Sequence, residues 1–283
     1  TFFAEGARGH LTKQLKSRFE LDRDSQTQIY GIGIKELWDI NPENHVPGRV
    51  IHTQGWPLSE TGTNGGGFLY HQANNQVALG FVTWLNYKNP WVSPFEELQR
   101  WKQHPEIRAI LEGGRRVSYG ARAINDGGWQ AVPKLDFPGG ALIGCSAGFV
   151  NVPRIKGSHT AMKSGMLAAE AAAAAIGAGR GSDSLGEYDA AVRDSWIAKE
   201  LKLVQNVLPA VEKYGDDIGT LLAGVDMWMR TLKIGLPISM KLHPDNESID
   251  RADLYQPIAY PKPDGVISFD RLTSVAQSFT NPE

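Results

Sequence analysis

The spacing of apolar and polar residues predicts several short strands and few helices in the first half of the chain. Residues 1–4 are strand-like, and Leu11, Leu15 and Phe19 then recur at helical spacing among basic residues. Further strand-like stretches follow at residues 28–39, 50–54, 68–71, 77–85, 117–124 and 141–145. The stretches at 68–71 and 77–85 flank the turn Ala73-Asn74-Asn75, which predicts a β-hairpin.

The expected helices have recognisable start and stop signals. In Ser93-Pro94-Phe95-Glu96 the serine can cap the free amides and the proline suits the first helical position. This helix is expected to run to about residue 104, to be interrupted by Pro105, and to end by residues 113–114. An Ala-rich helix is expected at 158–176 and a second helical stretch at 185–208.

Residues 219–240 form an unusually apolar segment rich in methionine and tryptophan, with Arg230 and Lys233 among them. Two interpretations are open. The segment can be part of the core, which the pattern alone favours because apolar stripes usually pack inside. It can also lie in a membrane interface, with tryptophan at headgroup depth and basic side chains extending towards water.

The composition is that of a globular protein with a nearly balanced charge. Apolar residues make up 41% and charged residues 21%, and the net charge of −2 gives no global attraction to nucleic acid. The single cysteine, Cys145, excludes a disulfide framework and a four-cysteine metal site within these residues. There is no apolar run of about 18 residues that could cross a bilayer unaided.

Three glycine-rich turns are candidates for close approach of a ligand to the backbone. Glu5-Gly6-x-x-Gly9 lies between a strand and a helix, and by itself is more simply an ordinary tight turn. Residues 144–148 end an apolar strand, at the point where α/β folds hold ligands. Residues 157–161 open the Ala-rich helix, whose free amides and dipole can receive a phosphate or an electron-rich ring atom. The alternative for this last turn is a simply capped helix.

The blocks that contain these turns resemble electron transfer flavoprotein–ubiquinone oxidoreductases. The longest block is residues 144–165, and the others follow the family's order: 55–58, 65–71, 93–95, 99–102, 111–114, 119–122 and 260–265. The resemblance is weakest across residues 177–253. It implies an α+β or α/β, FAD-linked reductase-like fold, in which a FAD domain is interleaved with an antiparallel-sheet quinone-binding domain.

The resemblance also implies a division of the chain into four regions. Residues 1–25 and 126–178 are expected in the FAD domain, and 26–125 mainly in the quinone-binding domain. Residues 179–283 are expected to be a helical, membrane-surface and linker region that leads to an iron–sulfur domain. The family's dinucleotide fingerprint would precede Thr1, and the cysteines of its 4Fe–4S cluster would follow Glu283.

The cofactor-binding residues that the resemblance implies lie in the three turns. The set is Glu5, Gly6, Gly144, Cys145, Ser146, Ala147, Gly157, Ser158, His159, Thr160 and Ala161. Cys145 stands where related flavoproteins have an aspartate for the ribityl chain, so the contact there is expected from backbone or from Ser146. The helix start at 157–161 is expected to face the pyrimidine edge of the flavin, where its positive end would stabilise the reduced ring.

Two further sets of residues are implied for ubiquinone and for the membrane. Gly65, Gly66, Gly67 and Phe68 match the quinone site, with glycine expected to give clearance to a flat ring. Gly67 stands where the family often has a hydroxyl side chain. Leu221, Leu222, Trp228 and Met229 match the membrane-surface region.

The function implied is transfer of electrons from electron transfer flavoprotein, through FAD and a 4Fe–4S cluster, to ubiquinone. We expect no acid–base pair, nucleophile or protein metal site, because the redox chemistry belongs to the cofactors. The expected location is the cytoplasmic face of a bacterial inner membrane or the matrix face of the mitochondrial inner membrane. The alternatives are a membrane flavoprotein of the geranylgeranyl-reductase or nitrogen-fixation type, and a non-catalytic membrane-binding fragment.

Overall fold

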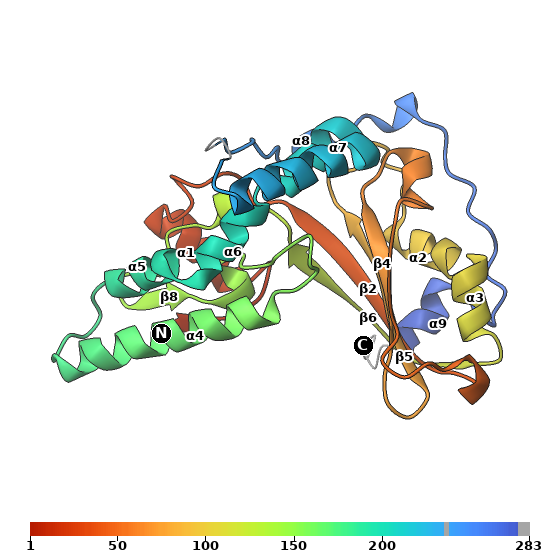
Figure 1. The fold of residues 1–283 in the computed structure, drawn as a ribbon, viewed down its shortest axis with the longest axis horizontal. Coiled ribbons are helices and arrows are strands. Elements are labelled where there is room, and N and C mark those ends of the chain that lie inside the picture. Colours follow the sequence, from red (N-terminus) through yellow and green to blue (C-terminus); the bar gives the residue numbers. More distant parts are fainter. Residues whose placement is uncertain (235–237, 277–283) are drawn as a thin grey trace. The chain divides into compact units, whose positions relative to one another are not determined.

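The computed structural model describes residues 1–234 and 238–276, and it divides into two compact units. The first unit contains Thr1–Tyr30 and Ala123–Pro244, and the second contains Gly31–Arg122 and the residues from Asp245 onwards. The chain therefore leaves the first unit after Tyr30, returns to it at Ala123 and leaves it again after Pro244, as Figure 1 shows by colour. The region expected as a single block at 179–283 is divided between the two units after Pro244.

The second unit is built on a five-stranded sheet in the order β3-β4-β5-β2-β6. Its strands are β2 (Tyr30–Asp39), β3 (Val50–Gln54), β4 (Gly65–His71), β5 (Gln76–Trp84) and β6 (Arg115–Asn125). The hairpin predicted from the sequence is confirmed, because β4 and β5 pair antiparallel with Leu69 opposite Leu79. Its turn contains Asn74 and Asn75 at φ 60° and 55°, a left-handed conformation that asparagine tolerates.

Helices cover one face of this sheet. They are α2 (Pro94–Lys102), α3 (Pro105–Leu111) and α9 (Arg271–Ala276), and Figure 1 shows α2 and α3 against the strands. The predicted start of α2 is confirmed, since the Ser93 hydroxyl accepts a hydrogen bond from the Glu96 amide at 3.4 Å. The break at Pro105 is confirmed as well, and α3 begins there.

The core of the second unit lies between the sheet and these helices. Trp38, Leu79 and Phe81 project from the strands and pack with Leu98 and Trp101 of α2. Residues two apart on a strand share a face, so the same period that buries Trp38 also buries the carboxylate of Glu36 on the helix side. The sheet thereby carries a charged group into the largely apolar core, where the charged residues Lys102 and Arg116 are buried as well.

The first unit contains a small sheet, β1-β8-β7, and most of the helices. The strands are β1 (Phe2–Phe3), β7 (Asp136–Phe137) and β8 (Gly140–Leu142); the long helices are α1 (His10–Phe19), α4 (Ser158–Gly177), α5 (Gly186–Asp194), α6 (Trp196–Val204) and α7 (Val207–Thr231). The strand expected at 141–145 is shorter than predicted, because Gly144 adopts φ 58° and turns the chain out of the sheet.

The helical stretch expected at 185–208 is also interrupted. Ser195 has extended backbone angles, and its hydroxyl accepts a hydrogen bond from the Ile197 amide at 3.1 Å, which starts α6 as a separate helix. Tyr188 of α5 is buried and donates its hydroxyl to the Leu142 carbonyl at 2.9 Å. This contact fixes α5 to β8, directly before the turn that begins at Gly144.

Candidate cofactor and quinone sites

Two of the three glycine-rich turns lie side by side at one edge of the small sheet. β1 and β8 are parallel neighbours, with Phe2 opposite Ala141 and Phe3 opposite Leu142, so the turns after them leave the same edge. The Ser146 hydroxyl lies 3.4 Å from the Gly6 carbonyl oxygen and donates to it. The structure thus brings the expected cofactor-binding turns at residues 5–6 and 144–147 together.

The third turn packs against the second. A β-carbon built on Gly144 would lie 3.4 Å from the β-carbon of Ala161, and the Gly144 amide donates to the Ser164 hydroxyl of α4 at 3.0 Å. The N-terminus of α4 at Gly157 receives no side-chain cap. Its first amides therefore stay available to an electron-rich group, and the helix dipole favours negative charge there. Ser158 starts the helix and is exposed.

Two residues of the turn at 144–147 are packed rather than reactive. Ala147 is fully buried and belongs to the core of the first unit. The Cys145 thiol is partly buried, and this burial raises its pKa, so that it remains a neutral thiol at neutral pH.

Glu5 caps the neighbouring helix α1. Its carboxylate accepts hydrogen bonds from the amides of Leu11 at 3.2 Å and Thr12 at 2.6 Å, and from the Thr12 hydroxyl at 2.7 Å. The hydrogen bond from the Thr12 side chain is the largest factor that lowers the pKa of Glu5. A β-carbon on Gly9 would lie 2.5 Å from the Glu5 β-carbon, so the glycine is required by this cap. A phosphate therefore cannot use the amides of Leu11 and Thr12.

Two side chains in the first turn of α4 are already engaged within the protein. The His159 Nε2 atom lies 2.8 Å from the Glu200 carboxylate, and its ring stacks on Trp196 of α6. The Thr160 hydroxyl lies 2.5 Å from the Phe149 carbonyl oxygen. These two residues can therefore reach a cofactor through their backbone amides, while their side chains hold α4 to its neighbours.

The glycines expected at the quinone site are required by the sheet itself. A β-carbon on Gly65 would lie 2.1 Å from the Val82 carbonyl oxygen, and one on Gly66 would lie 2.2 Å from that of Thr53. A β-carbon on Gly67 would lie 2.5 Å from the Trp101 ring. The neighbouring strands and α2 therefore fill the space beside these glycines. The glycines do not form an open slot for a ring.

Phe68 lies on the sheet face opposite α2, where Gly66 also lies, because alternate residues of β4 share a face. Its ring is buried and stacks on Tyr70 with centroids 4.9 Å apart. The ammonium group of Lys35 lies 5.7 Å above the Phe68 ring. A planar ligand on this face would meet backbone at Gly66 and an aromatic edge at Phe68.

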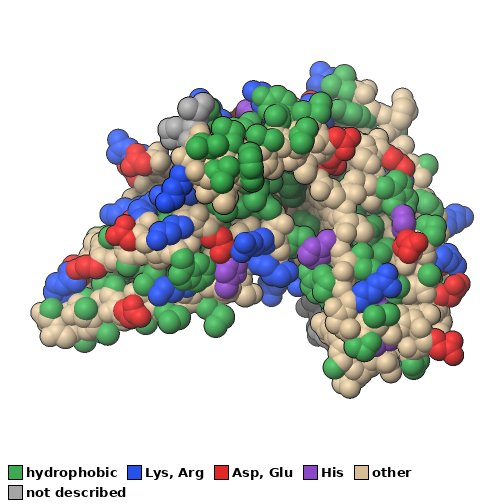
Figure 2. Space-filling model, in the orientation of Figure 1, with side chains coloured by type: hydrophobic (Ala, Val, Ile, Leu, Met, Phe, Trp, Pro, Cys, Tyr) green, Lys and Arg blue, Asp and Glu red, His purple; other side chains and the backbone are tan. Residues whose placement is uncertain are grey.

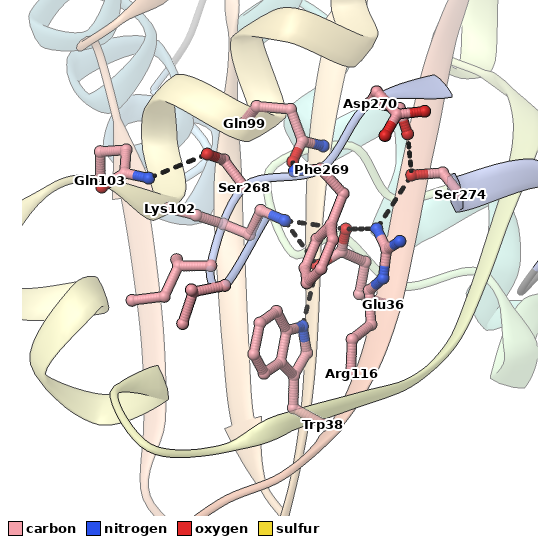
Figure 3. Close-up of polar contacts among 12 residues, drawn as sticks. Glu36, Trp38, Gln99, Lys102, Gln103, Arg116, Ser268, Phe269, Asp270 and Ser274 are labelled. Carbon is pink, nitrogen blue, oxygen red and sulfur yellow. Dashed lines mark hydrogen bonds and ion pairs between the residues drawn. The ribbon is translucent and has the colours of Figure 1, made fainter. Parts of the chain in front are cut away.

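A buried charge cluster on the helix-covered face was not predicted from the sequence (Figure 3). The Glu36 carboxylate accepts two hydrogen bonds from Lys102, at 2.9 and 3.0 Å, one from Arg116 at 2.9 Å and one from the Trp38 indole at 2.8 Å. All three charged side chains are fully buried. The arginine also lies 3.8 Å from the Phe269 ring centroid, so the cluster holds the chain before α9 on the sheet.

The Lys102 ammonium group is expected to make stability increase with pH. Burial is the largest factor that lowers the pKa of Lys102, to about 8 from an ordinary 10.5. Between these values the unfolded chain binds more protons than the folded protein, so the free energy of unfolding rises with pH. We expect a gain of about 2 kcal/mol from pH 8 to about 9.5, before tyrosines titrate. Denaturant titrations at several pH values measure it. The Lys102→Met variant should lack this gain, and an equal pH response in both proteins would contradict the assignment.

An apolar stripe runs along the exposed side of α7, and Figure 2 shows hydrophobic side chains gathered over this helix. Leu221 and Trp228 have exposed fractions of 68% and 65%, and Leu222 is exposed too, whereas Met229 is partly buried. Other exposed apolar residues share the spacing of three and four: Ile218, Val225 and Leu232. All of them follow Gly215, where the backbone leaves the helical conformation (φ 77°, ψ 175°). The core interpretation of this segment is therefore wrong for these side chains; residues 235–237 lie outside the described part.

No helix among the described residues is long and apolar enough to cross a membrane.

Among residues 1–234 and 238–276, no three histidine, cysteine, aspartate or glutamate side chains gather in a way that could hold a metal ion. The chemistry of the described turns is that of backbone amides, small side chains and one open helix N-terminus. Such donors suit the anionic or electron-rich groups of an organic cofactor.

Solved structures with a similar fold come from flavin-dependent proteins. A geranylgeranyl bacteriochlorophyll reductase-like protein from Thermoplasma acidophilum superposes with a TM-score of 0.50 at 15% identity, over 75% of this chain and 55% of that one. The flavin-dependent brominase Bmp2 gives a TM-score of 0.47 at 16% identity, over 81% of this chain and 55% of that one. At these identities the likeness concerns the fold alone. The expected α+β, FAD-linked reductase-like fold is confirmed.

Within the FAD-linked reductase-like fold, the sequence comparisons point to one family. Residues 30–124 match the family model "ETF-QO, ubiquinone-binding". The chain is 51% identical over its whole length to electron transfer flavoprotein-ubiquinone oxidoreductase of Pseudomonas aeruginosa, covering 51% of that protein. It is also 51% identical to the mitochondrial protein of Homo sapiens, covering 47% of it. The predicted resemblance is confirmed: the chain is similar over its whole length to members of this family, and it spans about half the length of the curated relatives it matches.

Proposed function

We propose that this chain forms part of an enzyme that transfers electrons from reduced electron transfer flavoprotein to ubiquinone. The observation that carries the proposal is the position of the match to the ubiquinone-binding family model. That match coincides with the five-stranded sheet, and the interleaved first unit contains the three candidate cofactor turns. The whole-chain similarity to relatives named for this activity supports the same function.

FAD is the proposed cofactor of the first unit, and the residues there fit it in part. Gly144, Ser146 and the amides that open α4 would hold it, with Gly6 contributing backbone. The uncapped N-terminus of α4 would stabilise negative charge on a ring placed against it. Bound FAD would supply one- and two-electron redox chemistry. A 4Fe–4S cluster is held by four cysteines, and these residues include one. The cluster is therefore proposed for another part of the longer protein.

Ubiquinone is proposed to bind the sheet face that carries Gly66 and Phe68. The neighbouring strands fill the space behind the glycines. The glycines therefore serve to let three strands approach closely and form a flat surface. The two partly exposed glycines, Gly65 and Gly66, would leave their backbone accessible to a ring. Phe68 would contribute an apolar edge, which suits a quinone head group.

The apolar stripe on α7 is proposed to lie in a membrane surface. Its residues are spaced as on one side of an amphipathic helix, and the exposed Lys233 follows the end of that helix, where a basic side chain can extend towards headgroups. Ubiquinone dissolves in the bilayer, so a membrane-surface helix would give the enzyme access to its acceptor. The proposed location is the cytoplasmic face of a bacterial inner membrane or the matrix face of the mitochondrial inner membrane.

Electron delivery to a ubiquinone analogue tests this function directly. The protein that contains these residues is mixed with catalytically reduced electron transfer flavoprotein and a short-chain ubiquinone, and the loss of quinone absorbance is followed. We expect quinol to form in proportion to enzyme. If a flavin-loaded protein forms no quinol but reduces a geranylgeranyl substrate, the reductase alternative holds. If the protein binds neither flavin nor quinone but still binds vesicles, these residues act as a membrane-binding fragment.

A further inference from the structure

A histidine and a tyrosine form a hydrogen-bonded pair on the sheet face that α2 does not cover. The His52 Nε2 atom lies 3.0 Å from the Tyr70 hydroxyl oxygen, and the centroids of the two rings are 5.7 Å apart. His52 is exposed and Tyr70 is partly exposed. Both side chains can therefore meet solvent or a ligand that lies on this face.

The strand register places the pair beside the proposed quinone surface. β3 and β4 are antiparallel with His52 opposite Phe68, and the β-carbons of directly opposed residues lie about 5 Å apart on one face. Tyr70 follows Phe68 by two residues, and the two rings stack with centroids 4.9 Å apart. Gly66 precedes Phe68 by two residues and belongs to the same face. A quinone ring at Gly66 and Phe68 would therefore have His52 as a neighbour.

The hydrogen bond to Tyr70 uses one ring nitrogen of His52 and leaves the other available. Within residues 1–234 and 238–276, Tyr70 is the hydrogen-bond partner of Nε2, and Nδ1 has none. A hydrogen bond at one nitrogen fixes the orientation of an imidazole, and histidine is the side chain that ordinarily gains and loses a proton near neutral pH. An oriented, exposed imidazole with one available nitrogen suits proton transfer to a ligand on this face.

We propose that His52 donates a proton to ubiquinone during its reduction and that Tyr70 holds the imidazole in position. The proposal rests on the quinone-binding part of the proposed function. Conversion of quinone to quinol adds two electrons, supplied by the proposed electron transfer, and two protons. The Nδ1–H bond of the His52 imidazolium breaks, and its proton bonds to one reduced quinone oxygen. The second oxygen takes its proton from water, and His52 regains a proton from water at Nδ1.

Quinone turnover tests this assignment in the enzyme that contains these residues. We expect His52→Ala and His52→Gln to lower kcat for ubiquinone reduction about 100-fold, the typical effect of a general acid. The KM for quinone should change less than about twofold, because the proton is transferred only in the reaction step. Tyr70→Phe should lower kcat about 10-fold, since the imidazole loses its fixed orientation. Imidazole added to the medium should restore part of the turnover of His52→Ala.

Two controls separate proton transfer from a structural effect. Ferricyanide accepts one electron and no proton, so its reduction by each His52 variant should equal that of the unaltered enzyme. His45 is another histidine of the second unit, and its Nε2 atom lies 2.8 Å from the Gln72 carbonyl oxygen. It lies before β3 and outside the proposed quinone surface, so His45→Ala should leave quinone turnover unchanged.

The outcomes distinguish this inference from the function on which it rests. If the unaltered enzyme reduces ubiquinone and both His52 variants keep its kcat, the inference is overturned. An equal loss of quinone and ferricyanide reduction also overturns it, because His52 then supports the fold or the electron path. If the unaltered enzyme reduces no quinone, the proposed function fails together with this inference. A loss confined to quinone, with recovery by imidazole, supports the proton donor.

Discussion

Replacement of Glu36 by glutamine is expected to lower the free energy of unfolding by about 4 kcal/mol. The Glu36 carboxylate is the shared partner of Lys102 and Arg116, and all three side chains are fully buried. Its loss leaves two buried cations facing each other, and removal of one partner from a buried pair typically costs about 3–5 kcal/mol. Guanidinium titration followed by tryptophan fluorescence measures the change, because Trp38 and Trp101 lie in the same core.

Two variants serve as controls for this prediction. Lys102→Met leaves Glu36 balanced by Arg116 alone and should cost much less than Glu36→Gln. Asp253→Asn breaks an exposed pair with Arg251 in the same unit and should change stability by less than about 1 kcal/mol. A Glu36→Gln variant as stable as Asp253→Asn would show that the cluster is not the buried charge network described.

The double variant Leu221→Ser/Trp228→Ser is expected to weaken binding to anionic lipid vesicles by at least about 100-fold. Each of these exposed side chains would move its apolar surface from water into the interface, which stabilises binding by roughly 1.5–3 kcal/mol. Co-sedimentation with vesicles at increasing lipid concentration measures the partition coefficient. The protein should stay folded, because neither side chain contributes to the core.

The control for vesicle binding is a double variant elsewhere in the same unit. Leu11 and Ile176 are exposed at 51% and 74%, but they lie on α1 and α4. Leu11→Ser/Ile176→Ser should leave vesicle binding unchanged. Equal loss in both double variants would indicate non-specific hydrophobic adsorption, and no loss in either would remove α7 from the membrane surface.

The sequence predicted those elements whose signals are local. The Ser93-Pro94 start of α2 and the asparagine turn between β4 and β5 depend on neighbouring residues, and both are confirmed. The break at Ser195 was missed because the flanking residues keep helical apolar spacing, and the serine cap overrides that spacing. The short β8 was over-extended because the predicted strand was carried to residue 145, into the glycine-rich turn, whereas Gly144 at φ 58° already turns out of the sheet.

The candidate site was predictable to the extent that it lies in turns. The motifs at residues 5–6, 144–147 and 157–161 were named from glycine patterns and from the family resemblance, and the structure brings them to one edge. The reason given for Gly66 was different from the one found, because the atom it avoids belongs to Thr53 on another strand.

The buried groups were missed because only long-range packing brings them together. Glu36, Lys102 and Arg116 are far apart in sequence, and each looks like an ordinary surface charge. Gln28 and Asn125, which both lie near Gly148, come from segments separated by residues 31–122 of the second unit. An isolated polar residue in a sequence carries no signal of burial, so such clusters become visible only with the fold.

A chimaeric enzyme tests the central claim, that these residues form a functional part of an electron transfer flavoprotein–ubiquinone oxidoreductase. The segment of the Pseudomonas aeruginosa relative that aligns with this chain is replaced by these 283 residues, at 51% identity. Turnover is then measured with reduced electron transfer flavoprotein and ubiquinone. We predict a flavin-loaded chimaera with turnover within about one order of magnitude of the parent. A folded, flavin-loaded chimaera that passes no electrons to ubiquinone would contradict the claim.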